Sequence, residues 1–97
     1  MASILMVDDE QPILEFVKNG LQKDGHFITA YSSATQVPLD KLNRYDLIIL
    51  DIMMPDMDGF SYCNKIRSLV DYPILFCQLR QWKMILHSGL AWEQTTI

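Results

Sequence analysis

Three aspartates stand where apolar runs end, and their types and spacing could do chemistry. The apolar run over residues 47–50 has the length of a buried strand and stops at a single carboxylate, Asp51. A second run, over residues 3–7, is followed directly by Asp8 and Asp9. If both runs are parallel strands of one sheet, their carboxyl ends share the edge at which open sheets bind ligands. We therefore expect the three carboxylates to meet.

Such a cluster calls for a cation. Like charges held close together raise the pKa of at least one carboxyl group unless a cation neutralises them. Mg²⁺ is the natural candidate because it takes oxygen ligands. A short acidic run is often only a solvated loop, and for residues 8–10 alone the two interpretations are equally good. The second acidic strand end, at Asp51, favours the metal site.

Two strings of this sequence resemble the receiver domain of bacterial two-component response regulators. They are ILMVDDE at residues 4–10 and DIMMPDMDG at residues 51–59. The second string is highly specific, and the spacing between the two also fits that family. The resemblance covers residues 1–76.

The resemblance implies a role for each acidic residue. Asp51 would accept a phosphoryl group from a sensor histidine kinase, and Asp8, Asp9 and Asp51, with the backbone carbonyl of Met53, would hold Mg²⁺. In-line phosphoryl transfer needs a positioned acceptor oxygen and a cation that neutralises developing charge. The implied protein is a cytoplasmic signalling domain and not an enzyme. Its parent would be a DNA-binding transcriptional regulator.

The alternation of strand and helix signals predicts an α/β fold with right-handed crossovers. Pro12 suits a first helical turn and Asp24-Gly25 a helix end, whereas Pro38 predicts a short or kinked second helix. The resemblance implies a doubly wound, flavodoxin-like parallel sheet with strand order 2-1-3-4. We expect strands at residues 3–7, 26–31, 47–50 and 72–76, and helices beginning near Pro12, at residues 39–42 and at 61–69.

Length and charge narrow the classes of function. The chain has 97 residues and a formal net charge of −4, which suits one small domain. No basic stripe is present to neutralise nucleic-acid phosphates, and no apolar stretch approaches the ~20 residues that span a membrane. Cys63 and Cys77 lack metal-ligand spacing, so we expect free thiols in a reducing cytoplasm.

The resemblance stops at Phe76, and residues 77–97 form a tail of another kind. A receiver would continue with a Ser or Thr, a fifth strand ending in Lys, and a last helix. One permitted choice of codons for the tail, reread two bases later, gives a Ser-Ala start and a Gly-Ala-Asp turn typical of that continuation. We hypothesise that the domain is truncated after its fourth strand and carries a frameshifted tail.

The tail itself has apolar residues at helical spacing, which predicts a short amphipathic helix. We expect that helix to cover part of the sheet edge and face left bare by the missing fifth strand and last helix. Otherwise two chains would cover it as a homodimer or a domain-swapped oligomer. The apolar residues are Leu79, Trp82, Leu86 and Leu90.

Three other functions compete with a phosphoacceptor. A haloacid-dehalogenase-like phosphatase needs a second aspartate two residues after the nucleophile, where this sequence has Met53. If Gly59 is aligned with the invariant glycine of an EF-hand loop, Met54 and Lys65 fall where that loop requires carboxylates. The serious rival is an inactive, receiver-like interaction fragment that oligomerises through its uncovered sheet edge.

Overall fold

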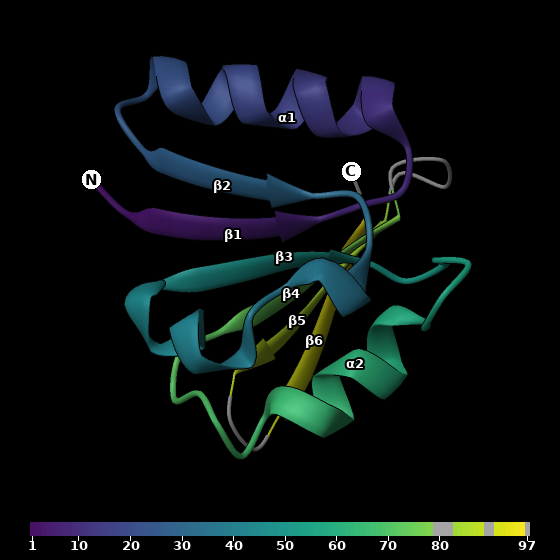
Figure 1. Cartoon of the computed structure of the whole chain (residues 1–97). Helices are drawn as coiled ribbons and strands as arrows, with labels where there is room; N and C mark the ends of the chain where they lie inside the picture. The colour runs from purple at the N-terminus through teal and green to yellow at the C-terminus, as the bar shows by residue number, and fades with distance from the viewer. Residues whose placement is uncertain (79–82, 89–90, 97) are drawn as a thin grey trace.

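A computed structural model of the chain describes residues 1–78, 83–88 and 91–96. It contains a single six-stranded sheet of order β2-β1-β3-β4-β5-β6 (Figure 1). The first four strands run parallel to one another in the order 2-1-3-4, which confirms the predicted fold class. The strands are β1 (Ser3–Val7), β2 (Phe27–Tyr31), β3 (Leu47–Asp51), β4 (Ile74–Gln78), β5 (Lys83–Ser88) and β6 (Ala91–Thr96).

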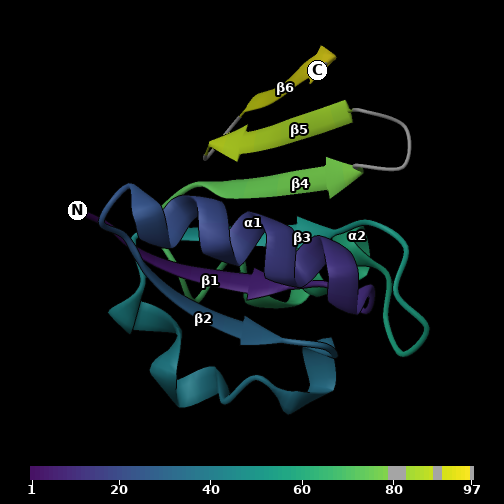
Figure 2. The same cartoon turned by 90° about the horizontal axis from the view of Figure 1, so that it is seen from above.

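Helices lie on both faces of the sheet. One face carries α1 (Gln11–Lys23), and the other carries α2 (Gly59–Ile66) with the short 3-10 helices η1 (Ala34–Gln36) and η2 (Leu39–Arg44) (Figures 1 and 2). This two-sided arrangement lets both faces of the parallel strands be buried, as their nearly continuous apolar sequences require.

Proline and glycine set the helix boundaries much as the sequence predicts. Pro12 lies in the first turn of α1, and Gly25 follows the helix with a φ of 89°. Pro38 precedes η2, a short 3-10 helix in the region where a short or kinked helix is predicted. The α2 helix begins at Gly59, two residues before the predicted start, and ends earlier than predicted.

The two faces of the sheet bury unequal cores. Leu5, Ile48 and Phe76, all fully buried, belong to the larger cluster beneath α2, which also takes in Tyr62 and Ile66. The smaller cluster lies beneath α1 and consists of Ile4, Met6, Leu14, Ile49 and Cys77. Cys63 lies in the larger cluster and Cys77 in the smaller, so the two cysteines are on opposite faces and both are free thiols, as predicted.

The prediction of a helical tail is wrong for the part of the tail that the structure describes. Residues 83–88 and 91–96 form β5 and β6, which extend the sheet as antiparallel strands beyond β4 (Figure 2). The open edge of β4 presents unpaired backbone groups, and a hairpin satisfies them whereas a helix would not. Leu86 lies in β5; Leu79, Trp82 and Leu90 fall outside the described residues.

No helix among the described residues has both the length and the apolar character needed to cross a membrane.

Candidate functional site

Parallel pairing of β1 and β3 brings the predicted acidic residues together. The register pairs Val7 with Leu50, so Asp8, which follows β1, lies beside Asp51, the last residue of β3. Asp8, Asp9 and Asp51 each offer a carboxylate oxygen, and these oxygens lie within 4.8 Å of one another. The structure therefore confirms that the three carboxylates meet at the carboxyl edge of the sheet.

Backbone hydrogen bonds hold two of these carboxylates in place. The side chain of Asp8 is only 4% exposed, and its Oδ1 accepts a hydrogen bond from the Glu10 N–H at 2.9 Å. The N–H of Asp8 donates to the carbonyl of Tyr31 at 3.1 Å, which ties the end of β1 to the end of β2. The Met53 N–H donates to Asp51 Oδ1 at 3.3 Å. Hydrogen bonds from the backbone thus fix the positions of Asp8 and Asp51 at the sheet edge.

The electrostatics of the cluster are unfavourable without a cation. Partial burial, followed by the negative charge of Asp8, raises the pKa of Asp51 from 3.8 to about 7. A hydrogen bond with Asp9 raises the pKa further, whereas the bond from the Met53 N–H lowers it. Because burial and mutual repulsion disfavour the ionised carboxylates, a proton or a metal ion bound between them is favoured.

The donor set fits a hard divalent cation. Asp8, Asp9 and Asp51 supply oxygen ligands from one edge of the sheet, and Asp8 is the only charged side chain buried among residues 1–77. Oxygen ligands with partial exposure to solvent suit Mg²⁺, which keeps several of its waters. Asp51 is partly exposed, so a reactant can approach its carboxylate more readily than that of the buried Asp8.

A buried thiol borders the acidic cluster. Cys77 pairs in register with Asp51 across β3 and β4, but its side chain packs into the apolar cluster beneath α1. Burial, with smaller contributions from the charges of Asp8 and Asp51, raises the pKa of Cys77 to about 11. The thiol therefore stays protonated at neutral pH and serves packing, because the thiolate is the nucleophilic and metal-binding form.

The loop between β3 and α2 folds back closely on Asp51. A Cβ atom added at Gly59 would lie 2.4 Å from the backbone oxygen of Asp51, which leaves room only for glycine. The Gly59 N–H donates to the carbonyl of Ile52 at 2.8 Å. The close approach at Gly59 therefore fixes the path of the chain behind Asp51.

Two further aspartates organise this loop, and neither role is predicted above from the sequence. Asp58 caps α2 by accepting hydrogen bonds from the Ser61 N–H and hydroxyl. A capping aspartate three residues before a serine is a readable signal. Asp56 accepts hydrogen bonds from the Ser33 hydroxyl and the Thr35 N–H. That contact joins two loops far apart in the sequence, so no local pattern could have revealed it.

The three methionines that follow β3 do not form one surface with Arg44 and Tyr45. Arg44 and Tyr45 precede β3, whereas the methionines follow it at the opposite end of the strand. Met54 is buried and Met57 packs against the larger core cluster. Of the three, only Met53 is exposed, at 64%.

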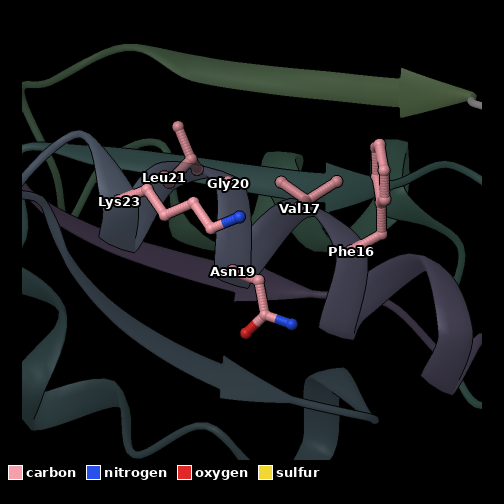
Figure 3. Close-up of a pocket in the computed structure, with 6 residues that line it drawn as sticks. All are labelled: Phe16, Val17, Asn19, Gly20, Leu21 and Lys23. Atoms are coloured by element: carbon pink, nitrogen blue, oxygen red, sulfur yellow. The ribbon is translucent and has the colours of Figure 1, made fainter.

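A groove of about 490 Å³ lies apart from the acidic edge, along the second half of α1 (Figure 3). Its walls are mainly apolar, and no carboxylate lines it. The residues that line it are Phe16, Val17, Asn19, Gly20, Leu21 and Lys23.

Comparison with known proteins identifies relatives of one kind. The family model described as "Response regulator receiver domain" matches residues 4–90, which extends past the boundary predicted at Phe76. The transcriptional regulatory protein SpaR of Bacillus subtilis is 46% identical over 90 residues, covering 93% of this chain and 41% of the relative. The transcriptional regulatory protein YvrH of Bacillus subtilis strain 168 is 42% identical, with 93% of this chain and 39% of the relative covered. This chain thus spans about two fifths of the length of these curated relatives.

Solved structures agree with the sequence matches. The response regulator protein TrrA from Thermotoga maritima, solved in complex with Mg²⁺-BeF, is 38% identical with a TM-score of 0.68. The match covers 76% of this chain and 66% of that one. A response regulator receiver domain protein from Clostridium thermocellum is 29% identical, with a TM-score of 0.72 over 78% of this chain and 64% of that chain.

Proposed function

Because this chain belongs to the family of response regulator receiver domains, we propose that Asp51 is its phosphoacceptor. The donor would be the phosphohistidine of a sensor histidine kinase in the cytoplasm. We assign Mg²⁺ to Asp8, Asp9, Asp51 and the backbone carbonyl of Met53. The observation that carries this proposal is the convergence of three carboxylates within 4.8 Å at the end of β1 and β3.

The attack on phosphorus is assigned to Asp51. The ionised Asp51 oxygen attacks phosphorus, forming an acyl phosphate while the bond between phosphorus and the histidine nitrogen breaks. Bound Mg²⁺ would neutralise charge on the transferring group. With a pKa of about 7, the Asp51 carboxyl is only partly ionised at neutral pH in the absence of a cation. The carboxylates of Asp8 and Asp9 would then act by holding the cation that keeps Asp51 ionised and accessible.

The larger protein would regulate transcription. Two relatives that this chain matches over most of its own length are named transcriptional regulatory proteins, and the chain spans about two fifths of each. We propose that phosphorylation of this domain controls the rest of such a protein, which would contact DNA, while this acidic domain would not.

Intact-mass measurement tests the phosphoacceptor role directly. The chain is incubated with a small phosphodonor such as acetyl phosphate, with and without Mg²⁺. We expect a gain of one phosphoryl group that needs Mg²⁺, is absent in Asp51→Asn, and persists in the matched control Glu15→Gln, which changes an exposed acidic residue on α1. A gain that survives in Asp51→Asn would contradict the assignment of the acceptor.

A second candidate function is that of an interaction fragment without phosphorylation chemistry. The observation that favours it is the order of the sheet, which ends in β6 with one side unpaired among the described residues. An open edge of this kind can pair with a second copy of the chain. A folded chain that forms dimers in light-scattering measurements and gains no phosphoryl group would favour this function over the first.

A further inference from the structure

Ser33 and Asp56 connect two loops that leave the sheet on either side of the acidic cluster. Ser33 follows β2, and Asp56 lies in the loop after β3. The sheet order places β1 between these two strands, and Asp8 and Asp9 follow β1. A link between the two loops therefore spans the end of the strand that presents two of the three carboxylates.

The link consists of two hydrogen bonds to the carboxylate of Asp56 and two contacts between Ser33 and Thr35. Asp56 Oδ2 accepts from the Ser33 hydroxyl and, at 3.1 Å, from the Thr35 N–H. The hydroxyls of Ser33 and Thr35 lie 2.8 Å apart, and the Thr35 N–H also approaches Ser33 Oγ at 3.3 Å. We refer to Ser33, Thr35 and Asp56 as the clasp. The Ser33 hydrogen bond, more than any other influence, lowers the pKa of Asp56, so the clasp carboxyl is ionised at neutral pH.

The chain on each side of the clasp also contacts the acidic cluster. On one side, the carbonyl of Tyr31, two residues before Ser33, accepts from the Asp8 N–H. On the other side, the N–H of Met53, three residues before Asp56, donates to Asp51. The clasp thus completes a ring of contacts. The ring passes through β1, which is followed by the buried Asp8, and through β3, which ends at the partly exposed Asp51.

We infer that Ser33 and Asp56 are positioning residues for the metal site, acting through the backbone of residues 51–56. This inference rests on the proposed function. Asp56 is exposed and touches none of the three cluster carboxylates in any hydrogen bond described above, so its effect would be indirect. By holding the loop in one conformation, the clasp reduces the ordering that a cation must impose when it binds Asp51 and the Met53 carbonyl. Partners outside the first ligand shell commonly change metal affinity in this way.

The variant Ser33→Ala tests the positioning role of the clasp without changing any charge near the metal site. This variant removes the hydroxyl donor and leaves every carboxylate in place. We expect the Mg²⁺ dissociation constant, measured by calorimetry on the whole chain, to rise about tenfold. The matched control is Ser32→Ala, because the neighbouring Ser32 hydroxyl donates to Gln36 instead of Asp56. Far-ultraviolet circular dichroism checks that each variant is folded.

Variants at Asp56 complete the test. Asp56→Ala should weaken Mg²⁺ binding about as much as Ser33→Ala, and the double variant should be no weaker than the worse single variant, because both remove the same link. Asp56→Asn keeps an acceptor for Ser33 and should recover most of the affinity. In the phosphodonor assay, Ser33→Ala should need more Mg²⁺ for half-maximal labelling but reach the wild-type rate at saturating Mg²⁺. A purely structural role would not produce that separation.

The outcomes distinguish this inference from the function on which it rests. If the wild-type chain binds no Mg²⁺, the proposed metal site fails and the positioning role fails with it. If the wild type binds Mg²⁺ and Ser33→Ala binds it equally well, only the positioning role is overturned. If Asp56→Ala weakens binding while Ser33→Ala does not, Asp56 acts through its charge alone and the clasp has no positioning role.

Discussion

Burial stabilises the interior of the sheet but is unfavourable for the charged groups at its acidic edge. In the interior, apolar side chains such as Ile48, Leu50 and Phe76 are fully removed from water, which stabilises the fold. At the edge, where β1 and β3 end, Asp8 is almost as deeply buried and Asp51 is partly buried. Burial there raises the pKa of Asp51 and opposes the charged form that binding needs.

This difference indicates that the interior and the ends of the parallel strands have separate roles. Their apolar segments supply the stability that lets the ends of the strands hold like charges together. A functional site that is unfavourable without its ligand must be supported by the rest of the fold. Changes in the interior should therefore lower stability strongly, whereas removing charge at the edge should raise it.

The largest effect should come from the interior. Phe76→Ala removes a fully buried ring that lies 4.7 Å, between ring centroids, from Phe60. We expect the free energy of unfolding to fall by about 3–5 kcal/mol, measured by urea denaturation. The control is Phe16→Ala, whose side chain is 77% exposed, with an expected change within about 0.5 kcal/mol. Equal losses in the two variants would break the comparison.

The next largest effect lies where the interior meets the edge. Gly59→Ala places a methyl group against the backbone oxygen of Asp51, and a backbone atom cannot move aside cheaply. We expect a loss of about 1–3 kcal/mol in urea denaturation. In contrast, Gly20→Ala in α1 meets no atom within 4 Å and should gain about 0.5–1 kcal/mol from helix propensity. A stabilised Gly59→Ala variant would show that the close approach does not constrain the loop.

Removing the charge of Asp51 should have the opposite sign. Between the ordinary pKa of 3.8 and about 7, the folded chain binds more protons than the unfolded chain, so stability falls as pH rises through this window. Asp51 is partly exposed, and solvent screening reduces the loss to about 1–2 kcal/mol. We expect the loss in wild type but not in Asp51→Asn, comparing urea denaturation at pH 5 and pH 8 in EDTA. Parallel pH profiles would contradict the raised pKa.

The smallest effect concerns a polar group inside the interior. The Tyr62 hydroxyl is buried and finds no hydrogen-bond partner among the described residues. Tyr62→Phe should therefore leave stability unchanged or raise it by up to about 1 kcal/mol in thermal and urea unfolding. Tyr72→Phe is the matched control, because its hydroxyl donates to the Leu42 carbonyl and its loss should cost about 1 kcal/mol. A clear loss in Tyr62→Phe would point to a buried partner such as water.

Much of the fold could be read from local patterns. The apolar runs that end in Asp8 and Asp51 predict strands, and parallel strands necessarily bring their carboxyl ends to one edge. Pro12, Gly25 and Pro38 mark helix boundaries because each restricts the backbone in its own way. The tail could not be read in this manner. Its apolar residues suit a helix, but the unpaired edge of β4 favours strands in β5 and β6. That preference arises from the assembled sheet and cannot be seen in the local sequence.

The sequence alone determined that three carboxylates belong together and that oxygen ligands would select a hard cation, because residue type and strand order are sufficient for both. Only the tertiary structure decided how deeply Asp8 is buried and that the pKa of Asp51 rises. It alone placed Asp56 against Ser33 and left no room for a side chain at Gly59. These properties depend on distances between segments that are remote in the chain, and such distances arise only when the sheet and its loops are packed.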